Sequence, residues 1–142
     1  KLGFDLGLSR LKEDEVAFLK DAVANWSRLQ NVILDGKQYR TVSPYEQNHM
    51  ALNYVSDDRS HAVLFAYDIH PRYKEPLQRV ILQGLDPDAR YFVREINLMP
   101  GRRSSLAENE KEYSGDYLMT IGLNAFTQTS MQSRVIELEK VK

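Results

Sequence analysis

The chain has 142 residues, and its 19 lysines and arginines nearly balance its 20 aspartates and glutamates, which leaves a net charge of −1. A near-neutral chain without a basic stripe gives no electrostatic reason to expect nucleic acid or an anionic membrane as a partner. The sequence contains no cysteine, which excludes disulfides and thiolate metal sites, and no apolar run approaches the roughly 20 residues of a membrane helix. The length suits one domain, or one domain and a fragment of another.

The first quarter of the chain predicts a short lead-in and then a long helix. Residues 1–9 begin with Lys rather than Met, so we expect a piece of a longer protein, and their alternating apolar residues favour an extended segment. From Glu13 to Leu34 the period becomes helical, with acidic residues at the N-terminus and Asp35-Gly36 as the stop. The apolar stripe must dock on another surface, and it consists of Val16, Leu19, Ala22 or Val23, Trp26, and Leu29 or Ile33.

After Gly36, short apolar runs alternate with turn residues, which predicts β-strands. The run from His61 to Ile69 is apolar on both faces, so we place it at the centre of the sheet. Pro100 to Glu112 is charged and aperiodic, which is typical of a surface loop. The expected fold is mainly β: an antiparallel β-sandwich or Greek-key domain preceded by one long amphipathic α-helix. Its strands are expected at residues 38–43, 51–56, 61–69, 77–83, 91–96, 116–123 and 133–139.

The stretch LQRVILQGLDPDARYFVREIN, residues 77–97, predicts a β-hairpin. Gly84 can take positive φ, and the sequence DPD after Leu85 has the chemistry of a type I turn. The flanking runs, Leu77–Gln83 and Tyr91–Ile96, are rich in β-branched and aromatic residues. We therefore expect two paired strands on either side of this turn.

The histidines and aspartates do not form a recognisable site. His49, His61 and His70 are scattered without a metal-ligand spacing, which favours structural or surface roles over zinc binding. The aspartate pairs 57–58 and 86/88 stand in turns, where Asp side chains bind backbone N–H groups. Turn chemistry is therefore the preferred interpretation of both pairs.

The remaining polar motifs do not indicate catalysis either. The loop acids Glu108, Glu110 and Glu112 lie beside Lys111 and are most simply a solvated face. No Gly-rich phosphate loop follows a strand, and there is no Gly-x-Ser-x-Gly elbow or cysteine nucleophile. The sequence thus predicts no catalytic residue, no metal site and no cofactor.

The eight tyrosines leave two interpretations open. Most of them alternate with apolar neighbours, as core or half-buried strand residues do. In a carbohydrate-binding module, however, exposed rings would lie against sugars. The rings that decide this are Tyr45, Tyr73 and Tyr113, which stand nearest to loops. If they line one face of the domain, sugar binding gains weight.

Several longer stretches, taken in order, resemble a known family. The segment GFDLGLSRLKEDEVAFLKDAVANWSRLQNVILDGKQYRTVSPYE is followed by YVSDDRSHAVLFAY, LQGLDPDARYFVREIN, YSGDYLMTIGL and SRVIELE. Together they resemble the C-terminal domain of bacterial α-galactosidases of glycoside hydrolase family 36, with the exit from the catalytic barrel upstream of it. The resemblance covers nearly the whole chain. The sequence departs from the family pattern at residues 100–112, a segment that is longer and more charged than the corresponding turn of the family.

The resemblance implies the tail of a modular retaining glycosidase. Residues 1–35 would be the end of a (β/α)8 catalytic barrel, with its last helix at about 13–34, and residues 36–142 a C-terminal antiparallel β-sandwich domain. The parent enzyme would hydrolyse terminal α-D-galactosyl residues of melibiose- or raffinose-type sugars with two barrel aspartates, one nucleophile and one acid/base. Both aspartates would lie upstream of Lys1. The tail itself would be structural and non-catalytic, and the barrel of its own chain would be its partner.

Two alternatives stay open at this point. One is a carbohydrate-binding module that uses surface tyrosines, and the other is the tail of an α-N-acetylgalactosaminidase. Members of the family often form tetramers, so the parent protein could be a homo-oligomer. We expect a soluble protein of the bacterial cytoplasm or periplasm, and the sequence does not decide between these compartments. The preferred galactoside, any sugar-binding residue and the packing of the helix without its barrel do not follow from the sequence.

Overall fold

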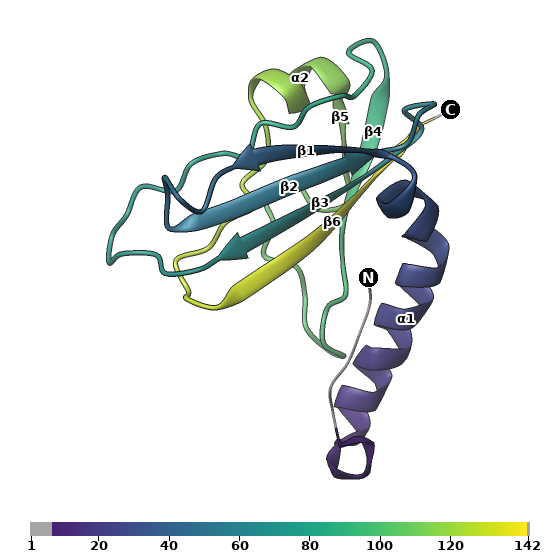
Figure 1. Ribbon diagram of the computed structural model, residues 1–142, viewed down its shortest axis with the longest axis vertical. Helices are drawn as coiled ribbons and strands as arrows, with labels where there is room; N and C mark the ends of the chain where they lie inside the picture. The colour runs from purple at the N-terminus through teal and green to yellow at the C-terminus, as the bar shows by residue number, and fades with distance from the viewer. Residues whose placement is uncertain (1–6, 142) are drawn as a thin grey trace.

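The computed structural model describes residues 7–141 and shows a β-sheet with a long helix against one side (Figure 1). The expected class, mainly antiparallel β preceded by one long helix, is confirmed. Most of the expected lead-in falls outside the described residues, and its last part, Leu8–Arg10, forms a 3-10 turn. The other elements are α1 (Glu13–Leu34), β1 (Lys37–Val42), β2 (His49–Val55), β3 (His61–Asp68), β4 (Arg90–Ile96), β5 (Lys111–Ser114), α2 (Gly115–Thr120) and β6 (Gln132–Lys140).

Helix α1 has the bounds that the sequence predicts. At its start the backbone N–H of Lys12 donates to the carboxylate of Glu15, at 2.8 Å, and the first turn holds three acidic residues. At its end the backbone N–H of Asp35 donates to the Asn31 carbonyl, at 3.0 Å. In the part of the chain that the structure describes, no helix is long and apolar enough to cross a membrane.

The six strands form one antiparallel sheet in the order β1-β2-β3-β6-β4-β5. The last strand, β6, inserts between β3 and β4, so that Ile136 lies opposite Leu64 and Leu138 lies opposite Val93. The predicted central position of β3 is confirmed. Both of its apolar faces are packed: Ala62, Leu64 and Ala66 face the main core, whereas Val63 and Phe65 face α1.

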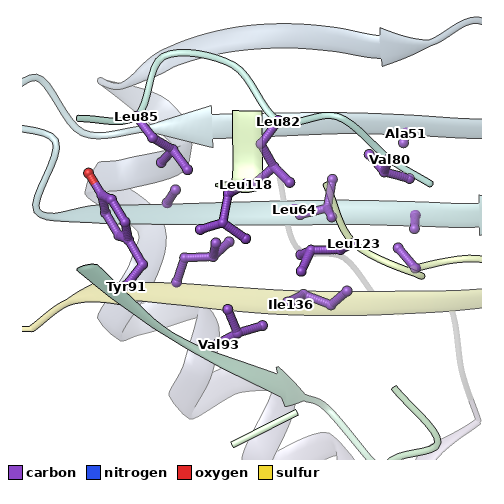
Figure 2. Close-up of a cluster of buried hydrophobic side chains, with 14 of the residues drawn as sticks. Ala51, Leu64, Val80, Leu82, Leu85, Tyr91, Val93, Leu118, Leu123 and Ile136 are labelled. Carbon is purple, nitrogen blue, oxygen red and sulfur yellow. The ribbon is translucent and has the colours of Figure 1, made fainter. Parts of the chain in front are cut away.

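The main core lies on the sheet face opposite α1, where α2 and extended segments form the second layer (Figures 1 and 2). Leu118 of α2 is fully buried against this face. Tyr91 is also fully buried, and its hydroxyl donates to the Arg59 carbonyl at 2.8 Å and accepts from the Asp86 N–H at 3.0 Å. The other core residues labelled in Figure 2 are Ala51, Leu64, Val80, Leu82, Leu85, Val93, Leu123 and Ile136.

Two of the predicted strands are wrong. Leu77–Gln83 is not a strand: within it only Val80 forms a bridge, to Leu123, so the predicted hairpin has one arm, β4. Its turn is nevertheless present, with the Ala89 N–H donating to the Asp86 carbonyl at 3.2 Å. The stretch 116–123 is mostly α2, because the Ser114 side chain caps the helix by accepting from the Tyr117 N–H at 3.1 Å.

Candidate functional site: the contact between helix α1 and the sheet

Helix α1 lies against the sheet through a small apolar centre. Leu29 of α1 is 3% exposed and packs with Val63 of β3 and Ile96 of β4. The partly buried residues around this centre are Val32, Ile33, Phe65 and Val135. The C-terminal part of the predicted apolar stripe, Leu29 and Ile33, therefore packs on the sheet of the same chain. Further toward its N-terminus, α1 reaches beyond the strands (Figure 1).

Beside the apolar centre, one buried carboxylate binds two arginines from different elements. Glu137 of β6 has a side chain that is 2% exposed. Arg28 of α1 donates from Nη2 to Glu137 Oε2 at 3.0 Å and also from Nη1 to Oε1. Arg94 of β4 donates to Oε2 at 2.8 Å. The carboxylate thus joins the helix, the last strand and β4 at one point.

The opposite charges at this point stabilise the ionised forms of Glu137 and Arg28. Burial raises the pKa of Glu137, but the hydrogen bonds from Arg28 and Arg94 outweigh it, and the net pKa is lowered. The hydrogen bond to Glu137 raises the pKa of Arg28. One turn earlier on α1, Asn25 accepts from Arg28 at 3.0 Å and donates to the Asn97 side chain at 2.8 Å. A row of polar contacts therefore fixes the rotation of the helix on the sheet.

The same region contains a group of possible metal ligands. His61, Glu137 and Glu139 each place one ligand atom within 4.8 Å of the other two. Both oxygens of Glu137, however, already accept hydrogen bonds from guanidinium groups. The two positive charges held at the carboxylate oppose the approach of a cation. The arrangement is suited to an ion-pair anchor.

Two hollows lie along α1. One, of about 260 Å³, lies between the helix and the sheet and is lined by aromatic side chains, among them Trp26, Tyr54 and Phe65. The other, of about 780 Å³, lies between the N-terminal half of α1 and the loop after β4, and its lining includes Arg102 and Arg103. The helix therefore covers the sheet only in part and keeps surface for further contacts.

The aspartate pairs have the turn roles that the sequence predicts. Asp58 accepts from the Ser56 hydroxyl at 2.7 Å and from the Ser60 N–H and hydroxyl at 3.0 and 2.8 Å. These hydrogen bonds, the one from Ser56 foremost, lower the pKa of Asp58 to about 2. Asp86 accepts from the Asp88 N–H at 3.2 Å. In each pair, one carboxylate binds a turn N–H group, and that of Asp86 also binds Lys140 Nζ at 2.9 Å.

The prediction of a solvated face at residues 108–112 is wrong for Glu108. This side chain is 4% exposed and binds Arg79 at 2.7 Å and the Asn124 amide at 2.8 Å. The loop folds back on the segment around Arg79 and buries the carboxylate there. Glu110 and Glu112 are exposed, as expected. The local sequence gives no signal that Glu108 is buried, because its partners Arg79 and Asn124 lie 29 and 16 residues away along the chain.

The histidines have structural positions. His49 is buried, its Nδ1 lies 3.0 Å from Asp68 Oδ1, and its ring stacks on Phe126 with centroids 4.6 Å apart. Asp68 in turn accepts from the N–H and hydroxyl of Thr127, at 3.0 and 2.8 Å. His61 is half-buried beside Glu139, and His70 is exposed. The described residues 7–141 bring no nucleophile to the His49–Asp68 pair, and the expectation that the chain holds no catalytic residue stays a prediction.

The three deciding tyrosines do not share one face. Tyr45 and Tyr73 are 98% and 90% exposed, on the loops between β1 and β2 and between β3 and β4. Tyr113 of β5 packs against the main core instead, and its ring stacks on Tyr117 at 4.9 Å. Burial raises the pKa of Tyr113. The prediction of core packing holds best for Tyr91, which is fully buried.

Comparison with known proteins assigns the fold to a family. The model of the glycosyl hydrolase family 36 C-terminal domain matches residues 49–138, which cover β2 to β6 and the core between them. The chain belongs to this family. The family 36 domain therefore includes Glu137 and Arg94 of the anchor, whereas Arg28 lies before the matched residues.

Relatives of this family 36 domain are α-galactosidases. A probable α-galactosidase G of Aspergillus terreus is 33% identical over 97% of this chain, and the α-galactosidase AgaA of Geobacillus stearothermophilus is 29% identical over 85%. The chain spans only 17% and 15% of these two proteins. In a crystal structure of AgaA, the similar part has a TM-score of 0.80 and 28% identity, and it covers 98% of this chain and 18% of that one.

Proposed function

We propose that this chain is the C-terminal, non-catalytic part of a longer α-galactosidase. The parent would release terminal α-D-galactosyl residues from galacto-oligosaccharides of the melibiose or raffinose type, with retention of configuration. Two observations support this proposal: the family assignment, and relatives named α-galactosidases that match 97% and 85% of the chain. Crystal structures of two variants of the Geobacillus AgaA, 27% and 28% identical to this chain, are described in complex with raffinose and with stachyose.

Within the parent, we propose that residues 1–35 end the catalytic barrel and that residues 36–142 form the accessory domain. The observation that carries this division is the anchor at Glu137. One carboxylate of the sheet binds Arg28 of α1 and Arg94 of β4, and Leu29 is buried beside it. A barrel helix held in this way cannot slide or rotate on the domain without breaking hydrogen bonds to a buried carboxylate. The domain's function is then to fix the last helix of the barrel that carries the catalytic aspartates.

The test uses the full-length enzyme. Removing residues 36–142 is expected to lower the melting temperature and to reduce activity on raffinose through loss of folded enzyme. Because that truncation can fail to fold, Arg28→Ala is the second variant: it keeps both domains and removes one half of the anchor. We expect a lower melting temperature with kcat/KM on a chromogenic α-D-galactoside unchanged at 25 °C, and no effect of the exposed control Glu139→Gln. Full activity and an unchanged melting temperature after the truncation would refute the proposal.

A further inference from the structure

Two loops at one end of the sheet enclose a polar groove that the anchor function does not use. They are the β1–β2 loop, residues 43–48, and the β3–β4 loop around residues 69–78 (Figure 1, at the left end of the strands). The groove has a volume of about 490 Å³. The side chains that matter for the argument are Tyr45, Gln47, Asn48, Arg72, Glu75 and Gln78, all of which line it.

The groove is built by hydrogen bonds between the two loops. The Asn48 carbonyl accepts from the backbone N–H groups of residues 69 and 70, at 3.1 Å each. The Asn48 side-chain amide donates to both oxygens of Glu75, at 3.2 Å, and the Arg72 N–H donates to one of them at 2.7 Å. Loops fixed in this way lose little conformational entropy when a ligand binds.

Groups on the walls remain available to a ligand. Within the described part of the chain, the side chains of Gln47, Arg72 and Gln78 make no hydrogen bond to the domain. Glu75 uses three of its roughly four lone-pair sites, so one acceptor direction is free. The hydrogen bonds from the Arg72 N–H and Asn48 lower the pKa of Glu75, which keeps it an acceptor at neutral pH. The Tyr45 ring is 98% exposed, so both of its faces are free of packing.

We propose that this groove binds a neutral carbohydrate, with the Tyr45 ring against the C–H face of a pyranose and with Arg72, Glu75 and Gln78 on its hydroxyls. A sugar ring offers an apolar face and several hydroxyls on one rigid frame, which matches one ring beside several free donors and acceptors. The groove holds Glu46 and Glu75 against Arg72, so it has no excess of positive charge for an anion. It also lacks the apolar pockets that anchor a peptide. The proposal does not depend on a catalytic parent.

The test is a titration of the 142-residue chain itself, followed by NMR signals of the Tyr45 ring and the side-chain amides. The probes are two neutral trisaccharides, raffinose and maltotriose, up to about 20 mM, which suits a dissociation constant of about 1 mM. We expect saturable shifts with at least one of them. Tyr45→Ala should weaken binding about tenfold or more, and Arg72→Gln, which changes no side-chain hydrogen bond of the domain, should also weaken it.

Tyr73→Ala is the matched control, since that ring is 90% exposed on the same loop pair but does not line the groove. Binding should be unchanged in this variant. The proposal is overturned if neither sugar shifts the Tyr45 signals, if binding survives Tyr45→Ala, or if Tyr73→Ala removes it equally. Signals of Tyr45 that change with protein concentration alone would mean that a second copy covers the ring, which also overturns it. None of these outcomes affects the anchor, which is tested by the melting temperature of the full-length enzyme.

Discussion

At the scale of single residues, Glu137 has the most demanding position in the domain. Its side chain is 2% exposed, in a strand whose neighbours on both sides are apolar. A buried carboxylate is stable there because two guanidinium groups neutralise its charge and donate three hydrogen bonds to it. Glu139, two residues on, has a side chain that is 58% exposed. The two residues differ in burial because α1 covers one and not the other.

Glu137→Gln should lower the free energy of unfolding by about 2 kcal/mol. The amide keeps one acceptor oxygen and turns N–H groups toward one of the two arginines, so a charged hydrogen bond is lost. Urea unfolding of the chain at pH 7 measures the change. Glu139→Gln is the control and should stay within about 0.5 kcal/mol of the original chain. Equal, small effects of both substitutions would mean that the anchor contributes nothing to stability.

The lowered carboxylate pKa values predict a loss of stability in acid. Glu137 has an ordinary pKa of 4.5 when unfolded and a lower pKa when folded, so below about pH 4.5 the unfolded chain takes up protons first. Its stabilising effect is complete above that pH and disappears as the pH falls through the folded value. The stabilising effect of the ionised Asp58 carboxylate is lost as the pH falls from 3.8, its ordinary pKa, to about 2, its pKa in the folded chain.

Unfolding free energies measured from about pH 5 to pH 2 should therefore fall with pH. In the Glu137→Gln variant they should fall less steeply, because one of the titrating groups is gone. The Glu139→Gln variant should follow the original chain. A variant and an original chain with the same pH dependence would contradict the pKa argument for Glu137.

At the scale of elements, the junction between α1 and β1 sets the position of the helix. Gly36 stands at this junction, and a Cβ there would lie 2.3 Å from the Val32 carbonyl oxygen and 2.6 Å from the Val55 carbonyl oxygen. Both atoms are backbone and cannot move away as a flexible side chain would. The helix end and strand β2 therefore approach each other as closely as glycine permits.

Gly36→Ala should destabilise the chain by about 3 kcal/mol, because the added methyl group forces the helix away from β2. Gly101→Ala is the matched control: Gly101 has φ of +76° but nothing within 4 Å of an added Cβ, so we expect about 1 kcal/mol from backbone strain alone. Thermal unfolding of both variants gives the comparison. A Gly36 variant as stable as the Gly101 variant would show that the junction is loose.

The elements also show how far sequence reasoning reaches. Helix α1 and strand β3 follow from local periodicity, and both have the predicted positions. Leu77–Gln83 alternates between buried and exposed residues like a strand, with Val80 and Leu82 buried and Ile81 exposed, but only Val80 bridges another segment. An alternation of buried and exposed residues indicates only that one face of a segment is buried. Whether the segment pairs with a strand depends on neighbours that its own sequence does not identify.

The short helix α2 and the anchor illustrate two different misses. For α2 the sequence holds a local signal, because Ser114 with Asp116 after it is typical of a helix start, but the apolar run that follows also suits a strand. For the anchor no local signal exists, because Arg28 and Glu137 are 109 residues apart and each reads as an ordinary surface charge. The family resemblance predicted the domain but not its buried ion pairs.

At the scale of the whole molecule, the domain has one closed side and one open side. The main core is sealed between the sheet and the layer with α2, whereas α1 leaves hollows on the opposite side, and Val23 and Leu34 of the helix are 46% and 60% exposed. The hollows along α1 leave room on this side for the neighbour that the proposed parent enzyme would supply. This fits the small share of each relative, 17% or less, that the chain covers in the Aspergillus terreus and Geobacillus proteins above.

The most direct test of the central claim is the size and activity of the native gene product, recovered with an antibody against this chain. The account predicts a band several times larger than 16.5 kDa, with α-galactosidase activity in the immunoprecipitate. A band at the size of the chain itself, without activity, would contradict the proposal that the domain serves as the tail of a hydrolase.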